Sequence, residues 1–302
     1  MPTESQQRAT NIGSRLLMVA AGVSWSIGGL LVRSQSVTDG WEIVFWRSLF
    51  MVMFMGGVLV VWHGRRAARV FLNVGMPGFL AGFFLSLTFF FFIISLTLTT
   101  VANTLVTMSM APFATAAFGW FFLGETIAFR TWIAMGVAVS GIVVMFADSL
   151  SGSGWIGNLI AAGVPLAYAC NLTLLRRAGT SVDMVPTVLI AGLVSIAIAL
   201  PAGWPLSATP GDVAILAFMG VVQLGLGCLL MTLAARRLKA AEIGLFTLLE
   251  TILGPLWVWL GIGEQPTSLA LAGGAVVVGA LAANELLGLR RSRAERKIGP
   301  AV

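Results

Sequence analysis

The chain alternates long apolar stretches with short connections that are rich in Gly, Pro, Ser and charged residues. Each stretch has the roughly 20 apolar residues that an α-helix needs to cross a bilayer. None shows the apolar/polar alternation of about ten residues that is typical of membrane β-strands. The pattern therefore predicts ten membrane-spanning helices, at residues 15–34, 39–62, 76–97, 101–123, 128–147, 155–176, 183–202, 210–235, 240–261 and 267–289.

Two of these stretches resemble each other when residues 100–127 are aligned with residues 239–266. They have the same length, and both end on Gly-Glu, with the glutamates at Glu125 and Glu264. We interpret them as the fourth helices of two internal repeats. The identical pairs are Ala102 and Ala241, Trp120 and Trp259, Gly124 and Gly263, and Glu125 and Glu264.

A second similarity joins the first and sixth predicted helices. Residues 24–28 (SWSIG) and 167–171 (AYACN) each place an aromatic ring among small residues, and each helix runs on to an arginine, Arg33 or Arg176. Five helices per half make the second repeat enter the membrane from the opposite side. We therefore expect an all-α integral membrane protein, with ten helices in two inverted five-helix repeats around a central cavity, as in many transporters. The expected segments are an N-terminal tail (1–14), the first repeat (15–147), the second repeat (155–289) and a basic C-terminal tail (290–302).

The distribution of basic residues predicts the orientation. With the N-terminus in the cytoplasm, 16 of the 18 Lys and Arg residues fall in cytoplasmic segments. The other two are Arg33, in an outer loop, and Arg47, within the second helix. Because positive charge is retained on the cytoplasmic side, the pattern predicts a multi-pass protein of the inner or plasma membrane with both termini in the cytoplasm.

The composition of the chain agrees with an integral membrane protein. The chain is 58% hydrophobic and 10% charged, whereas soluble domains carry about 25% charged residues. The formal net charge of +6 is explained by basic loops, so we expect a lipid bilayer and a small-molecule substrate as partners and no nucleic acid. The oligomeric state stays open.

The sequence shows no combination of residues that is typical of a catalytic or metal site. The chain has one histidine, His63, at the end of a span, and two cysteines, Cys170 and Cys228, inside apolar runs. It contains no metal-ligand spacing and no GxxxxGK[ST] nucleotide loop. We therefore expect neither an enzyme nor a bound metal or cofactor.

The aromatic residues among small residues at Trp25 and Tyr168, and the fourth and ninth helices that end on Gly-Glu, resemble the EamA-type drug/metabolite transporter superfamily. The resemblance covers nearly the whole chain and is most like bacterial exporters of amino acids, including aromatic ones. It implies ten helices, two inverted halves, a central cavity and export of metabolites. One departure is that Thr251 matches Pro112, and the proline of the ninth helix comes later, at Pro255.

Polar side chains inside spans are candidates for substrate binding, because their burial in lipid is costly. Glu250, midway along the ninth helix, can bind a substrate amine or a proton, or it can hold the bundle together near Pro255. Three amides can hydrogen-bond a substrate or join helices to one another. They are Asn103, Asn171 and Gln223.

Four further residues are predicted to line an aromatic-friendly path. Trp25 lies about ten residues into its span, too deep for the interfacial belt. Ser86 and Phe90 share one face of the third helix, since they are four residues apart. Met108 is a candidate for an adaptable apolar wall, although filling a gap in the core is the more common role of such a residue.

Two charged residues of the second helix are assigned a structural role. Glu42 and Arg47 lie toward one end of the span. A long side chain at that position can snorkel to the interface. We therefore leave both out of the expected substrate site.

The prolines of the paired helices are candidate gating positions. Pro112 lies near the middle of the fourth helix and Pro255 in the ninth. A proline removes one helix hydrogen bond and so creates a place where a helix can bend. We expect such bends to serve alternating access.

The function expected from the sequence is export of small metabolites, most simply amino acids, including aromatic and hydrophobic ones. Efflux of lipophilic cations, bound by Glu250, is the alternative transport function. A non-transporting membrane assembly subunit is the alternative of another class.

Overall fold

The computed structural model describes residues 4–147, 154–178, 184–235, 238 and 240–298. In this part of the chain, ten helical segments are long and apolar enough to cross a membrane. The ten spans predicted from the sequence are therefore confirmed, with ends that agree to a few residues. After the second span, which ends at His63, two short helical segments follow as far as Leu72.

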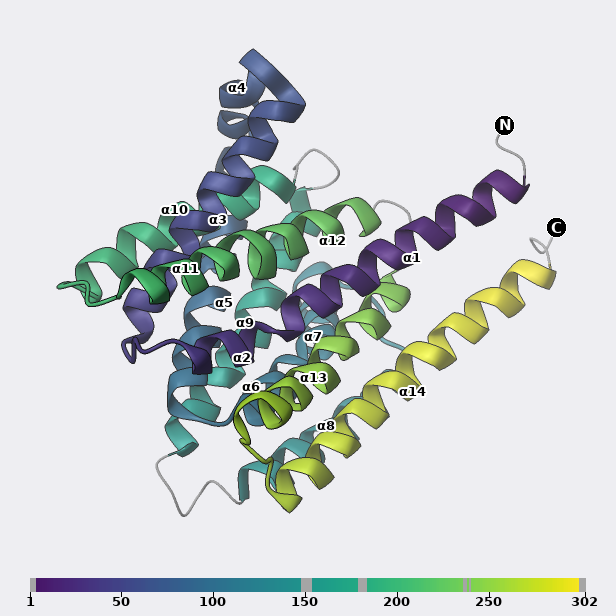
Figure 1. The fold of residues 1–302 in the computed structure, drawn as a ribbon. Coiled ribbons are helices and arrows are strands. Elements are labelled where there is room, and N and C mark those ends of the chain that lie inside the picture. The colour runs from purple at the N-terminus through teal and green to yellow at the C-terminus, as the bar shows by residue number, and fades with distance from the viewer. Residues whose placement is uncertain (1–3, 148–153, 179–183, 236–237, 239, 299–302) are drawn as a thin grey trace.

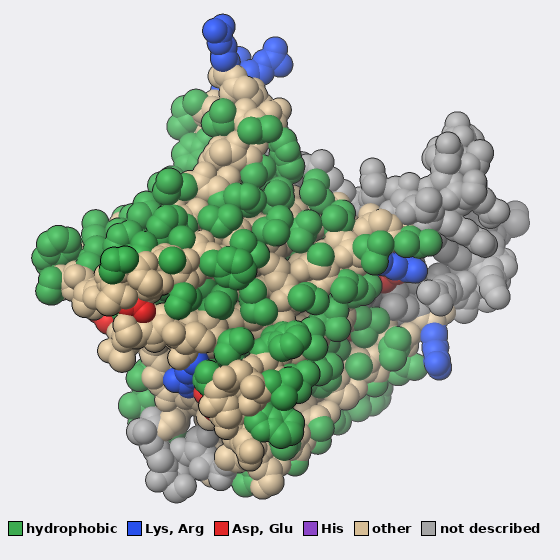
Figure 2. Space-filling model, viewed as in Figure 1, with side chains coloured by type: hydrophobic (Ala, Val, Ile, Leu, Met, Phe, Trp, Pro, Cys, Tyr) green, Lys and Arg blue, Asp and Glu red, His purple; other side chains and the backbone are tan. Residues whose placement is uncertain are grey.

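The spans form one bundle with both described ends of the chain on the same side (Figure 1). That placement agrees with an even number of crossings. Hydrophobic side chains cover most of the face seen in Figure 2, and charged side chains gather near its edges. A surface of this kind suits lipid and not water.

The elements are α1 (Glu4–Ser26), α2 (Gly28–Ser34), α3 (Gly40–His63), η1 (Gly64–Arg66), α4 (Ala67–Leu72), α5 (Gly75–Leu98), α6 (Val101–Met108), α7 (Ala111–Leu123), α8 (Phe129–Ala147), α9 (Gly154–Ala178), α10 (Met184–Ala202), α11 (Pro210–Phe218), η3 (Met219–Leu226), α12 (Gly227–Ala235), α13 (Ala240–Ile262) and α14 (Ser268–Ile298).

Small residues let helices approach until their backbones touch. The main helix pairs are α5 with α9, α8 with α14, and α3 with α10. Between α8 and α14, a Cβ atom added at Gly141 would lie 2.7 Å from the carbonyl oxygen of Gly273. These contacts supply the van der Waals packing that holds membrane helices together when lipid gives no hydrophobic drive between them.

Three spans are not continuous α-helices. The first is divided at Ile27 into α1 and α2. The fourth is divided into α6 and α7, which are separated by Ser109 and Met110. The eighth changes from α11 to the π-helical segment η3 and back to α12. Broken or π-helical turns inside a membrane are typical of functional positions.

The break in the fourth span changes the picture of Pro112. The sequence suggested one helix bent at this proline, but the structure has two helices, and Pro112 lies in the first turn of α7. A proline is tolerated there because the N–H that it lacks would have no partner inside the helix. Pro255, by contrast, lies inside the continuous helix α13.

The snorkelling proposed for Glu42 and Arg47 is wrong. Each side chain is 1% exposed. The carboxylate of Glu42 accepts hydrogen bonds from the backbone N–H groups of Ser207 and Ala208, both at 2.8 Å, and from the Ser207 hydroxyl. Glu42 thus fixes a connection between two spans, whereas Arg47 turns inward among the helices.

Candidate functional site: a polar cluster and contacts at both ends of the bundle

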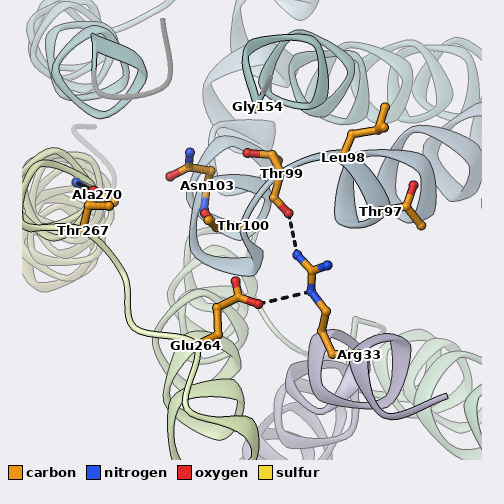
Figure 3. Close-up of a pocket in the computed structure, with 10 residues that line it drawn as sticks. All are labelled: Arg33, Thr97, Leu98, Thr99, Thr100, Asn103, Gly154, Glu264, Thr267 and Ala270. Atoms are coloured by element: carbon orange, nitrogen blue, oxygen red, sulfur yellow. Dashed lines mark hydrogen bonds and ion pairs between the residues drawn. The ribbon is translucent and has the colours of Figure 1, made fainter. Parts of the chain in front are cut away.

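A pocket lies where α2, α5, α6, α9 and α14 end on the same side of the bundle (Figure 3). Its volume is about 380 Å³. One wall is an ion pair in which Arg33 Nε lies 3.1 Å from Glu264 Oε2. Arg33 also donates to the carbonyl of Thr99 at 2.8 Å, so it links three spans. The other lining residues are Thr97, Leu98, Thr100, Asn103, Gly154, Thr267 and Ala270.

The two Gly-Glu motifs form matching structures. Gly124 and Gly263 have φ angles of 69° and 75°, a left-handed conformation that favours glycine and ends a helix. The glutamate that follows each glycine then pairs with an arginine at the end of another span. Arg176 Nη1 lies 3.1 Å from Glu125 Oε2, the same distance as in the Arg33–Glu264 pair.

A second pair of contacts joins the opposite ends of these helices. Arg15 Nη2 lies 2.6 Å from Glu242 Oε1. In the other half, Asn103 Nδ2 donates to Asn158 Oδ1 at 3.2 Å. Each end of the bundle, which we call a mouth, therefore carries two polar contacts between spans. Both are ion pairs at the mouth that carries α1's start, while the other mouth has one ion pair and one amide pair.

Glu250 lies deep between the mouths, near the middle of α13. It is 7% exposed, and no described residue makes a hydrogen bond or ion pair with its carboxylate. Leaving a carboxylate buried and unpaired is costly. Such a group is a functional candidate because no local packing role accounts for it.

Electrostatic interactions through Cys228 link Glu250 to two further polar side chains, Arg47 and Tyr168. Cys228 of α12 is 7% exposed and interacts electrostatically with both Glu250 and Arg47. Tyr168 of α9 interacts with Cys228 in the same way. We call Arg47, Tyr168, Cys228 and Glu250 the central cluster.

Two residues predicted from the sequence border this cluster. Gln223 lies in the π-helical segment η3, and its Nε2 donates to the carbonyl of Trp25 at 3.3 Å. Its Oε1 is buried without a partner among the described residues. The indole of Trp25 packs against Gly227, the neighbour of Cys228.

The remaining predicted residues lie elsewhere. Ser86 donates to the carbonyl of Phe83 within its own helix at 2.7 Å. Phe90 packs against Trp41, with ring centroids 5.3 Å apart. Asn171 joins α9 to α5 by donating to the Ala81 carbonyl at 2.7 Å. Asn103 borders the pocket of Figure 3, and Met108 packs on the core at the end of α6.

The sequence interpretation missed Arg47, Tyr168 and Cys228 as members of one site. A signal for Arg47 was present, because it is the one basic residue of the 18 that lies well inside a predicted span and not near its end or in a loop. Tyr168 entered the sequence interpretation only as part of the family resemblance. Nothing in the sequence around Cys228, which lies in an apolar run, indicated a functional role.

A ten-span bundle with buried, unpaired charge at its centre and polar contacts at both mouths is the architecture of a membrane transporter. The chain belongs to the EamA-like transporter family, whose sequence model matches residues 14–147 and again residues 155–284. The recognition made from the Gly-Glu motifs is thereby confirmed, and membership of this family makes the protein a transporter rather than an enzyme.

Two curated relatives and a solved structure agree with this assignment. The chain is 26% identical over 278 residues to the pseudopaline exporter CntI of Pseudomonas aeruginosa, in strain UCBPP-PA14 and in strain PAO1. The match covers 87% of this chain and 92% of each relative. A crystal structure with 17% identity superposes with a TM-score of 0.66 over 92% of this chain and 98% of that one, which supports the fold.

Proposed function

We propose that the protein exports small metabolites that carry a protonated amine, most simply amino acids, including aromatic and hydrophobic ones. The observation that carries this proposal is Glu250, a carboxylate buried without a partner at mid-membrane. A substrate amine supplies the missing counter-charge. The similarity to an exporter gives the direction.

Efflux of lipophilic cations also requires a buried carboxylate, but the central cluster disfavours it. Arg47 lies in the same cluster and adds a positive charge. A ligand that carries only positive charge would face repulsion from this guanidinium. An amino acid, which carries both charges, suits the cluster better.

The proposed mechanism is alternating access between the halves 15–147 and 155–289, inserted in opposite orientations with both termini in the cytoplasm. The family model matches each half separately. The ion pairs Arg33–Glu264 and Arg176–Glu125 supply similar contacts at opposite mouths. In an inverted repeat, contacts of this kind form and break in turn as the halves rock.

Transport by the protein alone is the direct test. Purified protein in liposomes preloaded with unlabelled L-phenylalanine is expected to accumulate labelled L-phenylalanine by counterflow. Empty liposomes are the control, and labelled glucose measures leakage. If no hydrophobic or aromatic amino acid exchanges faster than in empty liposomes, amino-acid export is the wrong function.

Pro112→Ala is expected to slow exchange without preventing binding. Pro112 stops α6 and α7 from joining into one helix, and alanine is a good helix former, so the variant favours a stiffer fourth span. Pro255→Ala is expected to favour the opposite accessible state, because its helix belongs to the inverted half. Labelling of a single cysteine placed near each mouth measures both effects. Equal labelling patterns with undiminished exchange would make these prolines packing features only.

A further inference from the structure

Three arginines lie together just beyond the end of the second span. α3 runs for 24 residues from Gly40 to His63. At 1.5 Å per residue its length is about 36 Å, which exceeds the roughly 30 Å of the hydrocarbon core. The segment formed by η1 and α4, which follows α3, therefore lies at the level of the lipid headgroups. It carries Arg65, Arg66 and Arg69, and it contains no acidic residue.

These arginines make no ion pair in the described part of the chain, where the three ion pairs use other arginines. Their side chains are exposed. Figure 2 shows Lys and Arg side chains at the tip of the projection that the end of α3 and α4 form in Figure 1. In the orientation predicted from the basic residues, this tip faces the cytoplasm. The structure thus presents three positive charges that no described carboxylate balances.

The short helix α4 is amphipathic and packs on the bundle. Ala67 belongs to a buried apolar cluster that also includes Leu59 of α3 and Val185 of α10. Val70 and Phe71 pack against the same cluster. The arginines of this segment are therefore held on a folded element, which positions their side chains before a ligand arrives.

An apolar groove begins beside this segment, and we call it the α5–α10 groove. Its walls come from the end of α4, the first turns of α5 and the middle of α10, and its volume is about 260 Å³. The Asn73 N–H donates to the carbonyl of Arg69 at 2.9 Å, so the arginine and the start of the groove share one helical turn. The lining residues are Phe71, Leu72, Val74, Gly75, Phe79, Ile190, Leu193 and Val194.

The groove opens toward lipid and not toward the centre of the bundle. A Cβ atom at Gly82 of α5 would lie 2.6 Å from Ile190 Cγ2 and 3.0 Å from the carbonyl oxygen of Thr187. The two helices therefore touch at this point and close the inner side of the groove. On its outer side, Phe79 and Leu193 are 48% and 45% exposed. An apolar occupant that approaches from the bilayer can reach it directly.

We propose that this site binds an anionic phospholipid of the cytoplasmic leaflet, with its phosphate on Arg65, Arg66 and Arg69 and an acyl chain in the α5–α10 groove. Guanidinium groups form paired N–H···O bonds with phosphate oxygens, and basic clusters at the cytoplasmic ends of spans attract anionic headgroups. A zwitterionic lipid brings its own positive charge and so complements the cluster less well. A soluble anion would leave the groove unused.

The test titrates the purified protein in detergent with dioleoylphosphatidylglycerol or dioleoylphosphatidylethanolamine and counts bound lipids by native mass spectrometry. The two lipids share their acyl chains and differ in the net charge of the headgroup. Wild type is expected to bind the anionic lipid about 10- to 100-fold more tightly at low salt, since each arginine near a headgroup contributes about fivefold. Glycerol phosphate is expected not to compete, because it has no acyl chain.

The triple variant Arg65→Gln/Arg66→Gln/Arg69→Gln is expected to lose this preference. It keeps the α5–α10 groove, so the binding that both lipids share through their acyl chains is expected to remain. The exposed arginines make no ion pair in the described part of the chain, and the melting temperature without lipid is therefore expected to stay close to that of wild type. That measurement shows whether the variant is folded.

The matched control Arg290→Gln/Arg291→Gln/Arg293→Gln removes the same charge from α14 and is expected to keep the preference. Leu193→Trp fills the groove and is expected to weaken the binding of both lipids by about tenfold, through lost burial of the acyl chain. Leu271→Trp, at a leucine of α14 that is 60% exposed, is its control and is expected to bind as wild type does.

Equal binding of the two lipids by wild type would overturn the proposal, and so would a preference for the anionic lipid that survives in the folded triple variant. Competition by glycerol phosphate would assign the arginines to a soluble phosphate compound instead. A lipid-free dimer that Leu193→Trp dissociates, as measured by light scattering, would assign the groove to a second copy of this chain. These results are independent of amino-acid exchange, which counterflow measures separately.

Discussion

Glu250→Gln is expected to reduce amino-acid exchange by about 100-fold or more. The substitution keeps the size of the side chain and removes the carboxylate that we propose pairs with the substrate amine. Removing one partner of a desolvated, hydrogen-bonded charge pair costs about 2–5 kcal/mol, and each 1.4 kcal/mol is tenfold. Counterflow of labelled L-phenylalanine in liposomes measures the loss.

The matched control is Glu285→Gln, which removes a carboxylate from α14, outside the central cluster. This control variant is expected to exchange at close to the wild-type rate. The stability of Glu250→Gln is expected to hold or rise, because an amide is cheaper to bury than an unpaired carboxylate. Undiminished exchange by folded Glu250→Gln would rule out this residue as the amine site.

The second large effect is on stability. Gly141→Leu is expected to lower the free energy of unfolding by about 3 kcal/mol or more, since overpacking a tight contact typically costs 1–3 kcal/mol and here the obstacle is backbone. The added Cβ alone would lie 2.7 Å from the Gly273 carbonyl oxygen. To accommodate the leucine side chain, α8 and α14 must move apart.

Gly136→Leu is the control in the same helix. Nothing lies within 4 Å of a Cβ atom built at Gly136, so the added side chain meets lipid. Thermal unfolding in detergent and the monodisperse yield are compared for the two variants. Equal melting temperatures would show that the α8–α14 contact is not tight in the membrane.

The number of spans and their ends were predictable because both follow from length and apolarity alone. A bilayer of roughly 30 Å fixes the length of each apolar stretch, and no long-range contact is needed to see it. The Gly-Glu ends were also visible, since a left-handed glycine ends a helix by local geometry. These local and solvent-imposed features make the fold class readable from the sequence.

The site was less predictable because it depends on how helices rotate against each other. Ser86 shares a helix face with Phe90, but its hydroxyl is satisfied by the carbonyl of Phe83. Arg47 is near enough to a helix end to snorkel, and only the rings of α5 show that it turns inward. The π-helical turn at Gln223 depends on packing that no local pattern specified.

In the proposed alternating-access mechanism, the contacts at the two mouths are expected to determine how far one state is favoured over the other. Their ion pairs are partly exposed, with side-chain accessibilities from 17% to 47%. Pairs of this kind contribute about 0–1 kcal/mol each and weaken with salt. Because these contacts are weak, the inward- and outward-facing states are expected to differ little in free energy. A ligand then needs only a modest difference in affinity for the two states to shift their populations. In the proposed alternating-access cycle, ionic strength and substrate binding are then expected to shift the resting conformation.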